Sequence, residues 1–554
     1  MTRAQPASVR EDDTPAVTQP TSRISRGPAF VYVALLSAVV LFFSVVRIRL
    51  RDMPLERDEG EYAYAGQLLL HGAAPYQHLY SVKLPGIYLA YAVMLSIFGK
   101  STAGIHAGLL VTCAASTLLL FLISRRLFGN LTALTAASSF ALLSTGAPVL
   151  GLAGHATHFV VLFALAAILL LLQGLESGRP GLIFGAGLLF GCAFLMKQPG
   201  LVFTGWAAVY VVQQRWARAM TWRQLATRLG ILLAGAALPY ALTCALMLGS
   251  GEFRPFWFWT FSYVRTYGSA VPLGDGLKML RYQAKAVVSA APGIWLLAVA
   301  GLTSFAWSAR ARTQVFLATS LLLFSGAGVS AGLYFRPHYF ILLLPAISML
   351  VGLAIGCATK ALSAQGKPAL TAAPVLLFLV AFAHPLYVQR KFFFTMTPNE
   401  ASRNTYGMNP FPEALEVGNY IRAHTAQDDT VAVLGSEPEI YFYGQRLSAS
   451  PYIYMYPLLE PEDSAVEMQR EMISQIEASR PAMLVRVNVP TSWIVYSKLG
   501  SMHTVLDWAR VYIAANYVQD GVVEIGDPTE YVWGEAARNH VPRTRLSLLI
   551  FRRK

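Results

Sequence analysis

A long series of apolar runs, each close to the length of a membrane-crossing helix, dominates this sequence. The first run, Ala29 to Val46, is about long enough to cross the hydrocarbon core of a bilayer. No small-residue cleavage site follows it and many similar runs do, so we expect a first membrane helix and not a removed signal. Further spans are predicted near residues 104–124, 131–150, 156–174, 181–196, 199–213, 229–249, 292–308, 314–334, 339–357 and 369–388.

The segment Leu84–Phe98 is also apolar but short, which is typical of an interfacial or re-entrant helix. The number of spans, eleven to thirteen, depends on segments of this kind.

Charged residues make up 13% of the chain, about half of what soluble domains carry, which disfavours a soluble multidomain enzyme. The four cysteines lie inside apolar runs without metal-like spacing and are predicted to be free thiols.

The net charge of +14 is unevenly distributed. Residues 1–399 contain 30 Lys and Arg against 11 Asp and Glu, whereas residues 400–554 contain 14 against 19. The short loops that carry the positive charge contain Arg125–Arg126, Arg179, Arg215, Arg218, Arg223, Arg228, Arg310, Arg312, Lys360 and Lys367. Basic interhelical loops are expected on the cytoplasmic side. This charge therefore indicates a multi-pass protein with a cytoplasmic N-terminus, and it does not indicate a nucleic-acid partner.

Three parts follow from this pattern. Residues 1–28 are rich in Pro, Thr, Ser and Arg and are predicted to form a disordered cytoplasmic tail. Residues 29–390 are predicted to form the membrane bundle, with a large first outer loop at 50–103. Residues 391–554 are predicted to form a soluble extracytoplasmic α/β domain, with helices at 412–426 and 464–479 and strands at 430–434, 482–487 and 546–551. The fold class is therefore mainly α.

Acidic residues are almost absent from the membrane part and are concentrated at the outer end of the first span. Only three occur from residue 62 to residue 399, whereas five occur within ten residues just before that stretch: Asp52, Glu56, Asp58, Glu59 and Glu61. A solvated juxtamembrane turn is the simpler interpretation. The flanking aromatic residues favour the alternative, in which crowded carboxylates provide a general base or ligands for a divalent metal.

Lys83 follows about twenty residues later, just before the short apolar segment, in Tyr80-Ser81-Val82-Lys83-Leu84-Pro85-Gly86. A cation at that boundary is suited to an anionic headgroup or phosphate. An ordinary interfacial lysine, with its stem in the lipid and its ammonium in water, is the alternative.

The order of these motifs resembles the membrane glycosyltransferases of the GT-C superfamily, and in particular the bacterial family-39-like branch. That branch includes protein O-mannosyltransferases and the aminoarabinose transferase that modifies lipid A. The matching motifs are the acidic run with Asp58-Glu59, the Lys83-Leu84-Pro85-Gly86 segment and Ile97-Phe98-Gly99. The match runs from about residue 55 to residue 126. Two positions differ from the pattern: the second motif is not Lys-Pro-Pro, and residues 151–157 contain no acid.

The resemblance implies a GT-C bundle in a bacterial plasma membrane. It also implies inverting transfer of a sugar from a polyprenyl-phosphate donor to an acceptor hydroxyl of a glycan, lipid or protein on the outer face. Asp58 matches the first-loop Asp that acts at the acceptor, and Glu59 lies beside it. Whether these two carboxylates also bind a divalent cation, Mg²⁺ or Mn²⁺, is left open. Lys83 is suited to the leaving phosphate.

Further candidates lie at predicted outer boundaries of the spans. For the donor phosphate they are Arg336, Lys197 and Arg265, although Lys197 stands at a hairpin tip with access to water and Arg265 lies in an aromatic stretch typical of an interfacial belt. For the acceptor or sugar they are Glu61, Tyr62, His155, His158, His338 and Tyr339. His155 and His158 also have a spacing at which two histidines on a helix bind a metal.

Two other classes of function are considered. A multispan transporter or flippase of lipid-linked sugars usually has internal repeats and charges at mid-membrane, and neither is found in this sequence. A non-catalytic scaffold for polymer assembly is the third class. In every case membrane lipids are expected partners.

Overall fold

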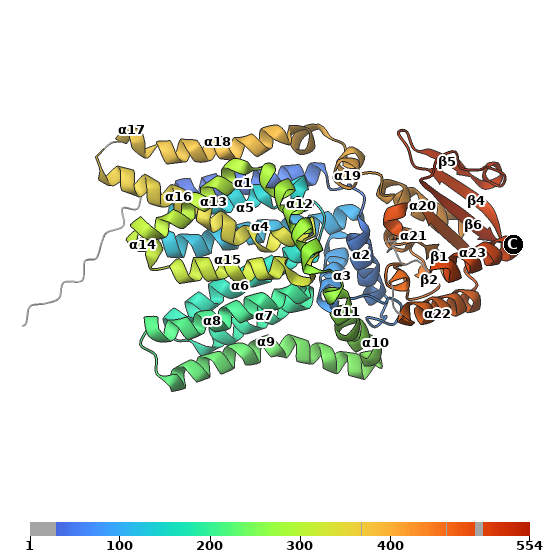
Figure 1. The fold of residues 1–554 in the computed structure, drawn as a ribbon, viewed down its shortest axis with the longest axis horizontal. Coiled ribbons are helices and arrows are strands. Elements are labelled where there is room, and N and C mark those ends of the chain that lie inside the picture. Colours follow the sequence, from blue (N-terminus) through green and yellow to red (C-terminus); the bar gives the residue numbers. More distant parts are fainter. Residues whose placement is uncertain (1–28, 367, 461–462, 494–501) are drawn as a thin grey trace, which may run out of the picture.

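The structure, a computed structural model, describes residues 29–366, 368–460, 463–493 and 502–554. A bundle of long helices is joined at one end to a smaller α/β domain that carries the C-terminus (Figure 1). This arrangement confirms the predicted fold class. The predicted tail at residues 1–28 lies outside the described residues.

Eleven helices of the described chain fall on the eleven predicted spans and run alongside one another in the bundle (Figure 1). They are α1 (Ala29–Arg49), α4 (Thr102–Phe128), α5 (Asn130–Leu143), α6 (Ala156–Ser177), α7 (Pro180–Met196), α8 (Leu201–Ala217), α9 (Trp222–Ser250), α13 (Pro292–Trp307), α15 (Val315–Val329), α16 (Leu344–Ala364) and α18 (Ala373–Val388). Among the described residues, α1, α4, α6, α9 and α16 are long and apolar enough to cross a membrane unaided. The predicted count of eleven to thirteen spans therefore requires that shorter helices also cross.

Small residues allow neighbouring helices of the bundle to approach closely. A β-carbon at Gly187 of α7 would lie 2.2 Å from the carbonyl oxygen of Leu232 in α9, and one at Gly191 would lie 2.4 Å from that of Ala236. Helix association in lipid depends on such close packing, because lipid tails are as apolar as the helix surfaces. Side chains at these two positions would separate α7 from α9.

The C-terminal domain is built on one six-stranded sheet with the strand order β2-β1-β3-β6-β4-β5. β1 is parallel to β2 and β3, whereas β6 is antiparallel to both β3 and β4. The strands are β1 (Thr430–Leu434), β2 (Leu447–Ser448), β3 (Met483–Asn488), β4 (Tyr517–Glu524), β5 (Glu530–Trp533) and β6 (Ser547–Arg553). The helices of this domain and of the link to it are α19 (Pro398–Tyr406), α20 (Phe411–His424), α21 (Glu439–Gly444), α22 (Asp463–Ser479) and α23 (Met502–Asn516).

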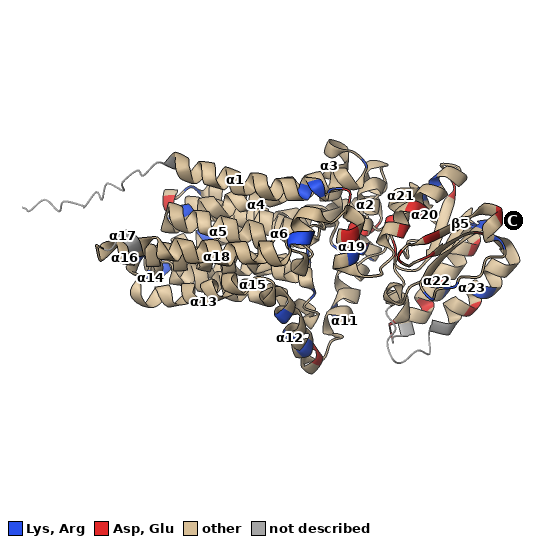
Figure 2. Cartoon of the chain, turned by 90° about the horizontal axis from the view of Figure 1, so that it is seen from above, with Lys and Arg blue, Asp and Glu red and all other residues tan. Residues whose placement is uncertain are grey.

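Short helices fill the junction between the bundle and this domain. They are α2 (Arg57–Leu70), α3 (Pro85–Phe98), α10 (Phe253–Trp257), α11 (Tyr263–Ser269) and α12 (Leu273–Ser289). Two further short helices, α14 (Ala309–Arg312) and α17 (Pro368–Thr371), lie at the other end of the bundle. Figure 2 shows few charged residues along the bundle and several acidic ones around α2 and α21. The junction therefore brings the acidic run of the sequence against the C-terminal domain.

Candidate functional site

The acidic run forms the beginning of helix α2, where its carboxylates point in different directions. Glu56 is the N-cap: its side chain accepts a hydrogen bond from the backbone N–H of Glu59, and the Glu59 carboxylate accepts one from the N–H of Glu56. This reciprocal capping box satisfies two N–H groups at the start of the helix. Because each helical residue turns the chain by about 100°, Asp58, Glu61 and Tyr62 share one face, and Glu59 lies on another.

Asp58 and Lys83 form the centre of the site. The ammonium of Lys83 lies 2.8 Å from Oδ1 of Asp58 and also donates to the hydroxyl of Tyr62 at 3.2 Å. The Asp58 side chain is 22% exposed, so the pair is largely shielded but open on one side. The two residues come from the start of α2 and from the segment before α3, so the rest of α2 and the loop after it separate them by 25 positions in the sequence.

Two histidines and a second lysine surround the other oxygen of Asp58. Nδ1 of His155 lies 3.7 Å and Nε2 of His338 lies 4.0 Å from Oδ2 of Asp58. The two imidazole rings stack with centroids 4.0 Å apart. Lys197 lies 3.3 Å from Nε2 of His338 and 4.1 Å from the centroid of the Tyr339 ring. The site therefore joins residues from α2, the start of α6, the end of α7 and the 3₁₀ helix η5 (Pro337–Leu342).

The charges of the site set the protonation of Asp58. Burial opposes its ionisation, but Lys83 and the two histidines outweigh burial and hold the pKa of Asp58 well below its usual value. Burial likewise opposes the charge of Lys83, but Asp58 and the neighbouring Tyr62 raise the pKa of Lys83 well above its usual value. Asp58 and Lys83 are therefore an ion pair at neutral pH.

Two nearby groups titrate close to neutral pH. Burial, followed by repulsion from Lys83, lowers the pKa of Lys197 to about 7. Burial also raises the pKa of Glu56 to about 7, with further increases from Asp58 and Glu59 and a decrease from His155. Groups with such values beside a cleft are typical of functional sites.

Glu61 and Tyr62 line the same face of α2 as Asp58. The hydroxyl of Tyr88 in α3 donates to Oε1 of Glu61 at 2.7 Å, and Lys83 lies 4.0 Å from Oε2. Burial raises the pKa of Glu61. Glu61 and Tyr62, two of the residues predicted to contact the acceptor or sugar, therefore border the Asp58–Lys83 pair.

Glu59 does not face Asp58. Its Oε1 accepts hydrogen bonds from the backbone N–H of Gly154 and from Nε2 of His106, and the side chain is fully buried. Glu59 thus ties α2 to α4 and to the loop before α6. A catalytic or metal-binding role for Glu59 beside Asp58 remains an untested prediction that this geometry does not favour.

The remaining predicted residues occupy different positions. Arg336 lies beside the site, where its charge helps to lower the pKa of Lys197. His158 is buried one turn into α6, with Nδ1 3.6 Å from Sγ of Cys113, and does not join His155 in a common site. Arg265 is exposed on α11. Lys197 itself is only 8% exposed, although its place at a hairpin tip predicted access to water.

Sequence reasoning missed the contact between Arg57 and the C-terminal domain. Arg57 forms an ion pair with Glu437 at 2.6 Å and donates to the carbonyl oxygen of Ser436. The hydroxyl of Tyr454 donates to the carbonyl oxygen of Arg57 at 2.9 Å. Ser436 and Glu437 directly follow β1, and the carboxyl ends of parallel strands commonly line sites. The position of Glu437 after a predicted strand was the only sequence signal for this contact, but its partner, Arg57, lies 380 residues away in the sequence.

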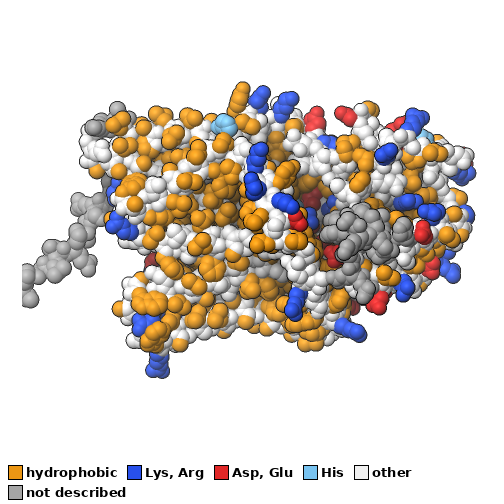
Figure 3. All heavy atoms as spheres, in the orientation of Figure 1, with side chains coloured by type: hydrophobic (Ala, Val, Ile, Leu, Met, Phe, Trp, Pro, Cys, Tyr) orange, Lys and Arg blue, Asp and Glu red, His pale blue; other side chains and the backbone are white. Residues whose placement is uncertain are grey.

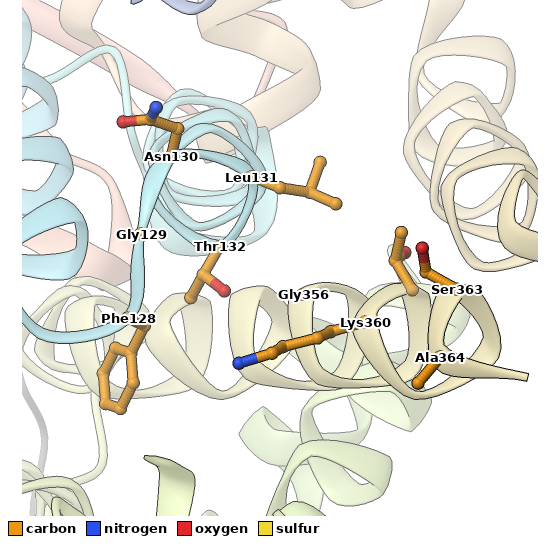
Figure 4. A pocket seen from close by; sticks show the side chains of 10 residues that line it. Phe128, Gly129, Asn130, Leu131, Thr132, Gly356, Lys360, Ser363 and Ala364 are labelled. Carbon is orange, nitrogen blue, oxygen red and sulfur yellow. The ribbon is translucent and has the colours of Figure 1, made fainter. Parts of the chain in front are cut away.

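A separate cavity of about 520 Å³ lies at the far end of the bundle, between the start of α5 and the end of α16 (Figure 4). Lys360 and Thr359 line it, and none of the described residues that line it is acidic. Without a carboxylate, this cavity lacks a candidate general base such as Asp58.

Part of the sequence and the overall fold of this chain are similar to those of known proteins. Residues 83–242 match the family described as dolichyl-phosphate-mannose-protein mannosyltransferase. No curated protein matches the chain by sequence. ArnT from Cupriavidus metallidurans bound to undecaprenyl phosphate has a similar structure, with a TM-score of 0.58, 15% identity and coverage of 94% of this chain and 98% of that one. Its apo form gives a TM-score of 0.55 at 16% identity, with coverage of 94% and 98%.

The archaeal oligosaccharyltransferase AglB from Archaeoglobus fulgidus, in complex with an inhibitory peptide and a dolichol-phosphate, is also similar. Its TM-score is 0.51 at 12% identity, and the match covers 93% of this chain and 75% of that one. The fold is therefore similar to that of ArnT and AglB over almost the whole of this chain. The match over residues 83–242 and the similarity of the fold agree with the resemblance to the GT-C superfamily that the sequence motifs carry.

Proposed function

We propose that this protein transfers a sugar from a polyprenyl-phosphate donor to an acceptor hydroxyl, with inversion, at the end of the bundle that carries the C-terminal domain. In a bacterial plasma membrane this end would face outward, because the loops at the opposite end are basic. The observation that carries the proposal is the Asp58–Lys83 pair, a carboxylate 2.8 Å from an ammonium with a second ammonium, Lys197, close by.

The cations of the site are suited to a phosphate. Lys83 contacts one oxygen of Asp58, and Lys197 lies beside His338, next to the other oxygen, with Arg336 close enough to influence it. The two lysines are buried or nearly so. Lys83 and Lys197 repel each other, which contributes to the lowered pKa of Lys197. A phosphate group bound between them would relieve that repulsion. Stabilisation of the departing phosphate by such groups is a large contribution to group transfer.

Donor binding would also activate the base. While Lys83 is paired with Asp58, the carboxylate has a low pKa and accepts protons poorly. A donor phosphate that draws Lys83 toward itself would weaken this ion pair and raise the proton affinity of Asp58. Asp58 would then take the proton of the acceptor hydroxyl while the acceptor oxygen bonds to the anomeric carbon of the sugar. The carbon–oxygen bond to the phosphate breaks, and the phosphate leaves with the electron pair.

The acceptor would approach from the side of the C-terminal domain. Tyr62 and Glu61 border Asp58 on α2, and His338 and Tyr339 border it on η5. Tyr454 of the C-terminal domain contacts the backbone of Arg57, one residue before Asp58. A glycan, lipid or protein hydroxyl that reaches Asp58 from this side would therefore pass the C-terminal domain.

A divalent cation at this site would be bound by Asp58, His155 and His338. One donor atom from each lies within 4.8 Å of the other two. Both ring nitrogens of His155 are buried, and neither has a hydrogen-bond partner among the described residues, so the nitrogens are available. A mixed oxygen and nitrogen set suits Mn²⁺ better than Mg²⁺. Such an ion would supply Lewis-acid stabilisation of phosphate oxygens.

The test is sugar transfer by the purified protein in liposomes, with a labelled polyprenyl-phosphate sugar as donor. Asp58→Asn should lower the turnover at least about a hundredfold, as expected for loss of a general base, and should still bind polyprenyl phosphate. Asp507→Asn is the control, since the Asp507 side chain is exposed on the C-terminal domain and pairs with Arg510. Wild-type turnover by a folded Asp58→Asn protein would rule out the assigned base. Movement of labelled lipid across the bilayer without covalent transfer would instead favour the flippase.

A further inference from the structure

Helix α12 lies across the direction of the bundle. It meets α13 at a bend of 102°, with a break at residues 290–291. α13 runs with the bundle, whereas α12 stands at the end near the C-terminal domain and projects from the bundle (Figures 1 and 2). If the bundle helices cross a membrane, the axis of α12 lies close to the plane of its surface.

The exposed surface of α12 has an apolar strip beside a basic one. At 100° per residue, Gly276 and Val287 fall on the buried side, whereas Leu273 and Leu277 are 66% and 50% exposed. Next to these exposed leucines the same rotation places the exposed side chains of Lys278, Arg281 and Lys285. Figure 3 shows Lys and Arg side chains among hydrophobic ones over this part of the surface. This pattern is typical of a helix at a membrane interface.

Most of the basic strip lacks a protein partner. Lys278 is paired with Asp275 at 2.8 Å. Among the described residues, Arg281 and Lys285 form no ion pair. Their apolar neighbours Leu273 and Leu277 would enter the lipid, which places these two cations at the level of the phospholipid headgroups. Each Lys or Arg near an anionic membrane surface strengthens binding by roughly fivefold.

The opposite face of α12 touches the segment that leads into the site. A β-carbon at Gly276 would lie 2.8 Å from Cβ of Leu333, so α12 rests directly on that residue. Leu333 and Phe335 both have positive φ angles, 58° and 43°, a conformation that non-glycine residues retain only where packing enforces it. Arg336 and His338 follow at once. A shift of α12 would therefore release this backbone and move Arg336.

We propose that α12 is a docking surface for anionic phospholipid headgroups in the leaflet nearest the C-terminal domain, and that this contact fixes the segment carrying Arg336. The lipid is favoured over a protein partner because the basic strip runs directly beside exposed leucines that continue the apolar surface of the bundle. The effect on Arg336 rests on the proposed function, whereas the lipid contact does not.

The first experiment measures the lipid contact alone. The full-length protein is placed in nanodiscs of phosphatidylcholine with or without phosphatidylglycerol, and retained lipids are counted by native mass spectrometry. The double variant Arg281→Gln/Lys285→Gln should retain phosphatidylglycerol about twenty-fivefold less well than the wild type. The matched control is Arg510→Gln/Arg538→Gln, two exposed arginines on the C-terminal domain, and should behave as wild type. Equal retention by all three proteins, or equal loss in both variants, would overturn the proposal.

The second experiment measures binding of polyprenyl phosphate to the same nanodiscs. Phosphatidylglycerol should strengthen binding several-fold in the wild type and in the control, but not in the α12 variant. An equal effect of phosphatidylglycerol in all three would overturn the link to Arg336. If the wild type shows no sugar transfer, the proposed function is refuted. If the α12 variant then still retains less phosphatidylglycerol than the wild type, the docking surface is supported nonetheless.

Discussion

The pKa of Lys197 predicts how donor-phosphate binding depends on pH. With a pKa of about 7 in the free protein, about a tenth of the Lys197 ammonium remains one pH unit above that value, and about a hundredth remains two units above. A bound phosphate would raise this pKa, so binding takes up a proton in that range. The affinity for polyprenyl phosphate should therefore fall up to about tenfold for each pH unit above 7, until the pKa of the bound form is reached.

Other groups of the site contribute little to this slope. The phosphate monoester has a second pKa of about 6 and is a dianion throughout the range. Lys83 stays charged because Asp58 and Tyr62 raise its pKa. His338 stays neutral because burial, His155 and Lys197 hold its pKa well below the usual value. Glu56 is the competitor: its pKa is also about 7, and its ionisation would weaken phosphate binding in the same direction.

The assay is competition of polyprenyl phosphate with a fluorescent analogue, in nanodiscs, from pH 7 to pH 9. Lys197→Arg should bind with nearly constant affinity across this range, because a guanidinium stays charged. Glu56→Gln should keep most of the slope of the wild type. A slope that persists in Lys197→Arg and disappears in Glu56→Gln would refute the assignment to Lys197.

Three further predictions concern the packing and the metal. Gly60→Ala should destabilise the protein by about 1–3 kcal/mol, because the new methyl would lie 2.5 Å from the backbone nitrogen of Glu439; thermal unfolding against Gly268→Ala, an open position, checks this. Glu59→Gln should lower stability by about 1–3 kcal/mol through its buried hydrogen bonds, and an unchanged melting temperature would contradict that role. His155→Ala should lower the affinity for Mn²⁺ at least about tenfold. The bound metal is measured by elemental analysis after chelation and dialysis against Mn²⁺. Equal Mn²⁺ content in the wild type and the variant would show that the proposed set of metal ligands is wrong.

Most of the fold could be predicted from the sequence because its helices and several of its strands have local hydrophobic patterns. The apolar runs gave all eleven bundle helices, and the strand prediction at 430–434 matches β1 residue for residue. The prediction missed the two-residue strand β2. It also missed β4 and β5, whose sequences Tyr517–Glu524 and Glu530–Trp533 are partly polar and flank a short turn. These strands are held by antiparallel pairing with β6 and with each other, and such long-range pairing leaves no local periodicity to read.

The site was accessible only in part. Asp58 and Lys83 could be assigned to one region because both motifs lie between the first two predicted spans, and the structure places them 2.8 Å apart. The burial of Lys197 could not be foreseen, since the ring that covers it belongs to Tyr339, more than a hundred residues away. The same holds for His155 and His338, whose stacking depends on the packing of α6 against η5. Each of these contacts joins segments that share no sequence pattern.

The acidic run itself shows why residue clustering overstates the number of catalytic groups. A helix start needs caps, and Glu56 and Glu59 satisfy each other's N–H groups there. Glu59 is further bound by Gly154 and Glu61 by Tyr88. Asp52 lies before the helix and is exposed beside Arg51. Within α2 and its cap, Asp58 has the most exposed carboxylate, and its charged partner, Lys83, is a group that a phosphate would attract. The concentration of acids therefore reflects one candidate base together with the hydrogen bonds that fix the helix presenting it.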